Sequence, residues 1–304
     1  MIQNYDLSSN CLVTKEEGTA FIEALTPTKS EIGALSDRFH FPFDYIGGIL
    51  DDYENARFEV RPEGTHLLLL QYPSEPTRGE IETYPYALVD ASSGPIILAL
   101  NHEVDISQLY GRHYEEKRAK HQLIYHIISQ MTKSFEAYLT DFRTLREKIS
   151  HSITKSTKND QLLAMIRMQS SLVYFEDALN NNCQVLKHYM DYLKEQGEDG
   201  FAERIFDLYL ACDQARNESR MQAKLIENLR DLFSNIVANN LNIVMKIMTS
   251  ATFVLGIPAI IVGFWGMNVP LPGQKITWMV WGILGFMALL SWYVAHWLKK
   301  RDLM

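Results

Sequence analysis

The sequence predicts an α+β domain, arranged as an α/β sandwich, followed by a long α-helical stalk and two C-terminal transmembrane helices. Strand and turn signals are confined to the first part of the chain, and proline is absent from residues 96–257. Residues 247–265 and 276–298 contain no Asp, Glu, Lys or Arg. The predicted parts are a cytosolic α/β domain at 1–115, a cytosolic stalk at 116–246 and a transmembrane domain at 247–304.

The first domain shows paired strand patterns. RFEVRPEGTHLLLLQYPS, at 57–74, contains two strand-like runs joined at Pro62-Glu63-Gly64. YPYALVDASSGPIILALNHE, at 84–103, predicts a second hairpin with its turn at Ser92-Ser93-Gly94. FHFPFDYIGGILDDYENA, at 39–56, predicts short helical turns. This mixture is typical of a compact α+β domain.

The stalk is predicted from helical periodicity. One apolar face recurs at steps of three and four residues, and the sequence EQGEDG at 195–200 interrupts it. A second helical pattern then continues without a breaker into the first span. A helix from Gly200 to Trp265 is about 100 Å long at about 1.5 Å per residue. The first apolar face comprises Met165, Met168, Leu172, Phe175, Leu179, Cys183, Leu186, Met190 and Leu193.

Each of the two C-terminal apolar stretches approaches or exceeds the roughly 20 residues that a helix needs to cross a bilayer. The alternative, buried helices of a soluble protein, requires a core that encloses both runs and their short loop. Lys246 precedes the first span, and Lys299, Lys300 and Arg301 follow the second. Basic flanks favour the cytoplasmic side. Because the N-terminus has no signal-peptide pattern, we expect a multi-pass protein of the plasma membrane with both termini in the cytoplasm.

Composition argues against several other classes. Cys11, Cys183 and Cys212 have no metal-type spacing and are expected to be reduced cytosolic thiols. The net charge of −8, without a basic cluster in the soluble part, argues against nucleic-acid binding. The sequence contains no GxSxG, HExxH or glycine-rich phosphate loop. We therefore expect neither an enzyme nor an organic cofactor.

One face of the first span carries only small or weakly polar residues after its first position. Two interpretations remain open. Small residues let membrane helices pack closely, or they line a narrow wet pore, which a single helix encloses only within an oligomer. Asn242 and Asn268 extend the face at its two ends, which favours the pore. The face comprises Met245, Thr249, Thr252, Gly256, Ala259, Gly263 and Gly266.

With these features together, the sequence resembles the CorA family of divalent-cation transporters. The resemblance is carried by YFEDALNNN at 174–182, NIVMKIMT at 242–249, the tripeptide Gly266-Met267-Asn268 and the basic KKRD at 299–302. Members of that family are homopentamers. The resemblance therefore implies a funnel-shaped homopentamer in which five copies of the first span line the pore.

The resemblance also implies roles for particular residues. Gly266, Met267 and Asn268 form the selectivity filter, where neutral amides can hydrogen-bond to the water shell of Mg²⁺ without removing it. Met245 and Met248 form an apolar constriction, and Asp231 lies near the cytoplasmic mouth. The implied pore-lining residues are Asn242, Met245, Met248, Thr249, Thr252, Gly256, Ala259 and Gly263.

Regulation by cytosolic Mg²⁺ is implied in the same way. Asp207 matches a carboxylate of the family's metal-sensing site between subunits, and Asp213 is an alternative ligand. The partner from the N-terminal domain falls near Gly48, where Asp44, Asp51 and Asp52 are close but none matches cleanly. Solvated surface charge is the simpler interpretation of Asp51 and Asp52.

The transported ion is expected to be Mg²⁺, with Co²⁺ and Ni²⁺ as further candidates. No His or Cys lies in the proposed pore face, which argues against a dehydrated site for a soft metal. The loop after the tripeptide, VPLPGQK, has no acidic residue, unlike many relatives. The alternatives are a Zn²⁺ transporter of the same architecture and a membrane-anchored sensor or scaffold without transport.

Overall fold

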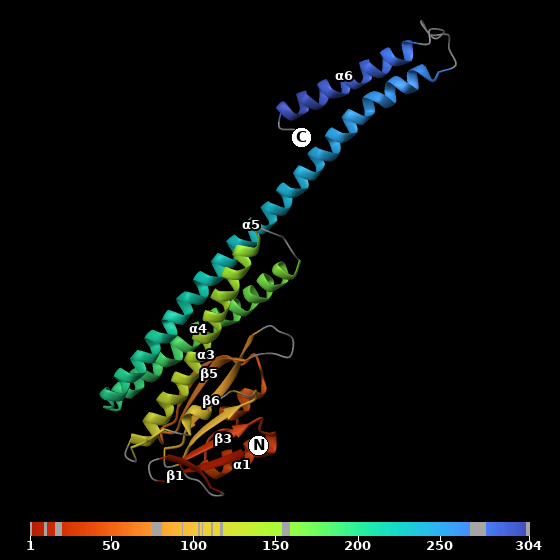
Figure 1. Ribbon diagram of the computed structural model, residues 1–304. Coiled ribbons are helices and arrows are strands. Elements are labelled where there is room, and N and C mark those ends of the chain that lie inside the picture. The colour runs from red at the N-terminus through yellow and green to blue at the C-terminus, as the bar shows by residue number, and fades with distance from the viewer. Residues whose placement is uncertain are drawn as a thin grey trace. The chain divides into compact units, whose positions relative to one another are not determined.

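The computed structural model describes residues 2–8, 11–15, 20–74, 81–92, 94–102, 104, 106–110, 112–115, 118–153, 159–267 and 278–301. The chain forms two compact units, Met1–Arg230 and Asp231–Met304. Figure 1 shows the elements of each unit.

A seven-stranded sheet forms the centre of the first unit, with strand order β2-β1-β3-β7-β6-β5-β4. All neighbouring strands are antiparallel except β3 and β7. Gly64, with φ of +88°, turns the chain between β4 and β5, as the predicted hairpin requires. The strands are β1 Ile2–Ser8, β2 Cys11–Thr14, β3 Phe21–Leu25, β4 Arg57–Val60, β5 His66–Ser74, β6 Glu82–Asp90 and β7 Ile96–Leu100.

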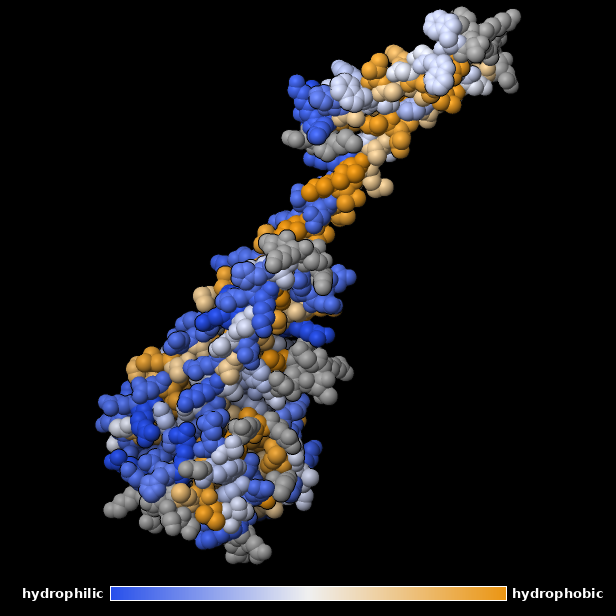
Figure 2. Space-filling model, viewed as in Figure 1, coloured by the Kyte–Doolittle hydropathy of each residue, from blue (hydrophilic) through white to orange (hydrophobic). Residues whose placement is uncertain are grey.

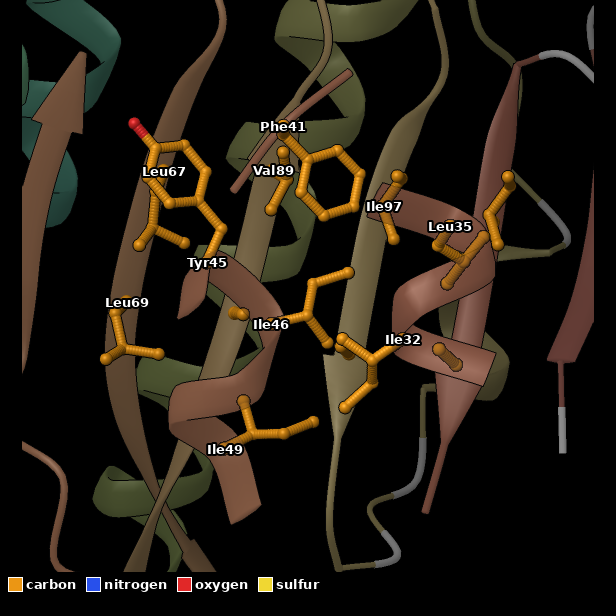
Figure 3. Close-up of a cluster of buried hydrophobic side chains, with 14 residues drawn as sticks. Ile32, Leu35, Phe41, Tyr45, Ile46, Ile49, Leu67, Leu69, Val89 and Ile97 are labelled. Atoms are coloured by element: carbon orange, nitrogen blue, oxygen red, sulfur yellow. The ribbon is translucent and has the colours of Figure 1, made fainter. Parts of the chain in front are cut away.

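Helices cover both faces of this sheet. The short helices α1 (Lys29–Phe39) and α2 (Phe43–Gly47), with the 3₁₀ turn η1 (Gly48–Leu50), pack over one face. Figure 3 shows Ile32 and Leu35 of α1 and Ile46 of α2 directed at the strands. Residues of β5 alternate between the two faces, yet Leu67 to Leu70 are all buried, as expected of strands covered on both sides. The α/β sandwich is thus confirmed.

The opposite face of the sheet lies against two long helices, α3 (Ala119–Ile153) and α4 (Asn159–Glu195). α4 ends at Glu195 and α5 (Asp199–Trp265) begins four residues later, with Gly197 at φ +80° in the turn. The predicted break at 195–200 is therefore correct, and so is the single helix that continues to Trp265. All residues of the predicted apolar face of α4 are buried except Met190, which is partly exposed.

Asn182 of α4 joins this helix to the edge of the sheet. Its side-chain oxygen accepts from the backbone N–H of Gln71 at 2.9 Å, and its amide nitrogen donates to the Gln71 carbonyl at 2.7 Å. Ser171 performs a similar function by accepting from the N–H of Ile81 at 3.0 Å. The sequence motif that contains Asn182 therefore has a role in packing, which the sequence pattern did not reveal.

The second unit is a helical hairpin. It consists of α5 from Asp231 onward and α6 (Met279–Lys300). Both helices are long and apolar enough to cross a membrane. Figure 2 shows hydrophobic residues along both of them. The 3₁₀ turn η2 (Ser107–Leu109) completes the described elements.

Candidate functional site

α5 and α6 meet along one face of the first span. Near the loop that joins them, an apolar groove is lined by Ile261 and Trp265 of α5 and by Met279 and Ile283 of α6. Towards the other end, Ser250 is only 2% exposed. Ser250, Ile261 and Trp265 fall on one side of α5, because at 100° per residue they lie within about 60° of each other.

The small-residue stripe predicted from the sequence lies on the opposite side of α5. At 100° per residue, its members are centred roughly 140° around the helix from Ile260, Ile261, Phe264 and Trp265, which line the groove against α6. They are exposed or partly exposed. A Cβ atom built on Gly256 or Gly263 would have no atom within 4 Å other than its chain neighbours and the adjacent backbone of its own helix. Close packing against α6 of the same chain therefore does not explain these glycines, and the stripe is free to face other copies of the chain.

Two methionines and two polar residues continue this side of α5 towards its N-terminal end. Met245 and Met248 are 62% and 66% exposed, and Asn242 and Asp231 are also exposed. The hydroxyl of Thr252 donates to the carbonyl of Met248 at 2.9 Å, within the helix. The methionine thioethers thus project from the helix where the stripe begins.

α5 ends at the predicted tripeptide. The N–H of Gly266 donates to the carbonyl of Val262 at 2.9 Å, and that of Met267 to the carbonyl of Phe264 at 3.4 Å. A Cβ on Gly266 would approach the Val262 oxygen to 3.1 Å, tighter than most real Cβ contacts, so glycine suits this tight helix end. Asn268, the predicted filter amide, lies outside the described residues, and so does the loop that follows it.

Tryptophan marks both ends of the hairpin. All five tryptophans of the chain lie between residues 265 and 297. Trp265, Trp278 and Trp281 are near the loop, whereas Trp292 and Trp297 are near the end of α6. The Arg301 guanidinium lies 5.3 Å from the Trp297 ring centroid. Trp at the two ends of a span and basic residues at one end are typical of helices that cross a membrane. The tryptophan positions are a sequence signal for the two spans in addition to apolar length and basic flanks.

The predicted regulatory carboxylates lie in different surroundings. Asp207 is exposed on α5. Asp213 is paired with Arg216 and also accepts from the Asn217 amide at 3.1 Å. Asp52 pairs with His102 at 3.0 Å. Within the described part of one chain, no three His, Cys, Asp or Glu side chains form a group that could hold a metal.

Comparison with known proteins identifies the family. A family model described as "CorA-like Mg2+ transporter protein" matches residues 16–300. The chain belongs to the CorA-like family. The curated "Cobalt/magnesium transport protein CorA" of Methanocaldococcus jannaschii is 23% identical to this CorA-like chain over 180 residues. That alignment covers 57% of this chain and 56% of the relative, little more than half of its length.

Solved structures confirm the fold of the CorA-like chain. The complete structure of the CorA magnesium transporter from M. jannaschii matches with a TM-score of 0.82 at 19% identity, covering 99% of this chain and 98% of that one. The full-length CmaX protein matches with a TM-score of 0.71 at 10% identity, covering 95% and 96%. The predicted family and fold class are therefore correct, and the residue roles stay predictions.

Proposed function

We propose that this CorA-like protein is a channel for divalent cations rather than an enzyme, with hydrated Mg²⁺ as its main substrate. Five copies of the chain would surround a pore lined by α5, with α6 outside. The stripe of α5 carries this proposal, because it faces away from α6, leaves Gly256 and Gly263 unobstructed and ends at the Gly-Met-Asn sequence. The family's description as Mg²⁺ transporters supports the choice of ion.

The chemistry of the stripe fits a hydrated ion. Mg²⁺ loses its water reluctantly, and hydroxyl, amide and backbone groups can hydrogen-bond to that water without replacing it. From Met245 to Asn268 the stripe offers Thr249, Thr252 and Asn268 but no carboxylate, imidazole or thiol. An ion bound in this way is held weakly enough to leave, as conduction requires.

In this proposal, Met245 and Met248 close the pore. Rings of Met245 and Met248, brought together in a pentamer, would form an apolar constriction that excludes water and therefore ions. Asp231 would attract cations at the cytoplasmic mouth. Mg²⁺ between subunits, with Asp207 and Asp213 as candidate ligands, would favour the closed arrangement. Residues 1–230 carry 35 acidic and 24 basic side chains, so subunits that meet through this region repel each other until cations offset the charge.

The membrane orientation follows from charge. Residues 231–304 carry five basic and two acidic side chains, and three of the basic residues, Lys299, Lys300 and Arg301, lie at the C-terminal end of α6. We therefore propose that the protein lies in the plasma membrane with both of its termini in the cytoplasm. Residues 1–115, 116–246 and 247–304 are proposed as the cytosolic, stalk and transmembrane domains.

Flux through reconstituted protein tests the proposal. Proteoliposomes should take up Mg²⁺, and Asn268→Ala should reduce the rate at least tenfold while the assembly keeps its elution volume. Asn240→Ala is the matched control, because Asn240 is an exposed asparagine of α5 that points away from the stripe. A wild-type rate of Mg²⁺ uptake in Asn268→Ala would show that Asn268 is not part of a selectivity filter. Zn²⁺ uptake exceeding Mg²⁺ uptake would favour a Zn²⁺ transporter, and no flux of any cation would favour a sensor or scaffold.

A further inference from the structure

Two cysteines from different helices face each other in the first unit. Cys183 lies on α4 and Cys212 on α5, and their sulfur atoms are 3.1 Å apart. Both are free thiols, 3% and 1% exposed respectively. A covalent S–S bond is about 2.05 Å long, so about 1 Å of approach separates this pair from a disulfide. The function proposed above uses neither residue.

The two thiols differ in acidity. In the dithiol, the Cys183 thiol donates to the Cys212 sulfur, and the Cys212 thiol donates to the Leu179 carbonyl. The hydrogen bond between the two sulfur atoms lowers the pKa of Cys183; burial opposes this effect and the Arg216 guanidinium adds to it. Cys183 and burial together raise the pKa of Cys212 well above its usual value. Cys183 is therefore the thiol that forms a thiolate first, and a thiolate is the nucleophile in thiol chemistry.

We propose that Cys183 and Cys212 are an oxidative modification site, at which a small peroxide converts the dithiol into a disulfide that joins α4 to α5. The Cys183 thiolate attacks one oxygen of hydrogen peroxide, the O–O bond breaks, and protonated hydroxide leaves as water. This step produces a sulfenic acid at Cys183. The Cys212 thiol then attacks that sulfur, the S–O bond breaks, and a second water leaves. The dithiol loses two electrons and two protons, and one peroxide becomes two waters.

Burial selects the class of oxidant. Sulfur atoms that are almost completely covered can be reached by hydrogen peroxide during small openings of the packing, but not by a bulky disulfide such as oxidised glutathione. Leu179 supports the geometry, since its carbonyl accepts from the Cys212 thiol at 3.4 Å and holds Cys212 beside Cys183. The reverse reaction requires a small dithiol reductant, with dithiothreitol as the laboratory probe.

Mass mapping of the full-length protein in detergent tests the proposal. After treatment with hydrogen peroxide and alkylation of the remaining thiols, we expect a peptide pair linked between Cys183 and Cys212, which dithiothreitol separates again. In Cys212→Ala, dimedone should trap a sulfenic acid at Cys183. In Cys183→Ala, Cys212 should stay reduced under the same treatment. Cys11→Ala is the matched control, because Cys11 lies in β2 and the link should form as in the wild type.

Three results would overturn the proposal. The first is wild-type protein in which both thiols are alkylated after peroxide treatment that oxidises Cys11. The second is a link that joins Cys11 to either buried cysteine. The third is glutathione attached to Cys183 or Cys212 in folded protein, because such an adduct requires the open access that the structure denies. The first of these depends on no variant and so is independent of how the alanine variants fold.

Discussion

Replacing Asn182 by leucine should loosen the attachment of α4 to the sheet. β4 pairs with β5 only up to Leu69, so the outer edge of β5 has no strand partner at Gln71. On the other side, Gln71 faces Pro85 of β6, which has no N–H to donate. The side chain of Asn182 therefore satisfies both backbone groups of Gln71, at 2.9 Å and 2.7 Å.

The size of the effect follows from these two hydrogen bonds. A buried backbone group without a partner costs about 1–3 kcal/mol, so the two groups of Gln71 cost about 2–6 kcal/mol. Burying the larger apolar side chain in Asn182→Leu offsets about 1–2 kcal/mol of this. We expect a net loss of about 3 kcal/mol in the local stability of β5, which corresponds to roughly 100-fold faster amide exchange at Gln71.

Hydrogen–deuterium exchange of the full-length protein in detergent is the measurement, because it reports on β5 directly, whereas all five tryptophans lie in the other unit. Asn181→Leu is the matched control, since the Asn181 amide contacts only the exposed Asp177 on the same helix at 3.3 Å. Exchange at Gln71 in Asn182→Leu within about threefold of the wild type would refute the reasoning. In that case water or a backbone shift would satisfy Gln71 instead.

Three further predictions concern the proposed channel and the partly buried His126. Met245→Gly should raise the leak of Mg²⁺ through the channel in proteoliposomes at high internal Mg²⁺. Ile243→Gly, on the α6-facing side of the helix, should not raise it. Equal leak in the two variants would place the gate elsewhere. Asp207→Asn and Asp213→Asn, singly and together, should raise the internal Mg²⁺ concentration for half-inhibition, and an unchanged midpoint in all three would exclude both as sensors. Burial lowers the pKa of His126 to about 4. As the pH falls, His126 therefore takes up its proton in the unfolded protein before it does so in the folded protein. The contribution of neutral His126 to the stability of the folded protein is fully present above about pH 6.5 and is lost as the pH falls towards 4. His126→Leu should flatten this loss in thermal unfolding followed by circular dichroism, and an unchanged pH profile would contradict that assignment.

Sequence alone determined the features that depend on neighbours along the chain. Turn residues such as Gly64 and Gly197 ended the elements they were expected to end, because only glycine adopts a positive φ without strain. Periodicity predicted α4 and the uninterrupted α5, since helical faces recur every three to four residues. The apolar runs and their basic flanks predicted the two spans for the same local reason. Family membership followed from short motifs in a fixed order.

The tertiary structure decided which faces and edges meet. The parallel pairing of β3 with β7 joins strands more than 70 residues apart, and no local pattern encodes that choice. Asn182 resembles its neighbour Asn181 in sequence, but only Asn182 reaches the free edge of β5. Cys183 and Cys212 show no metal-type or disulfide spacing, yet antiparallel helices bring their sulfur atoms together. The small-residue stripe of α5 was predicted from the sequence pattern. Only the tertiary structure shows that α6 packs against a different side of α5 and leaves the stripe exposed. Each of these contacts depends on how separate elements pack, and the free energy that selects the packing is shared among residues far apart in sequence.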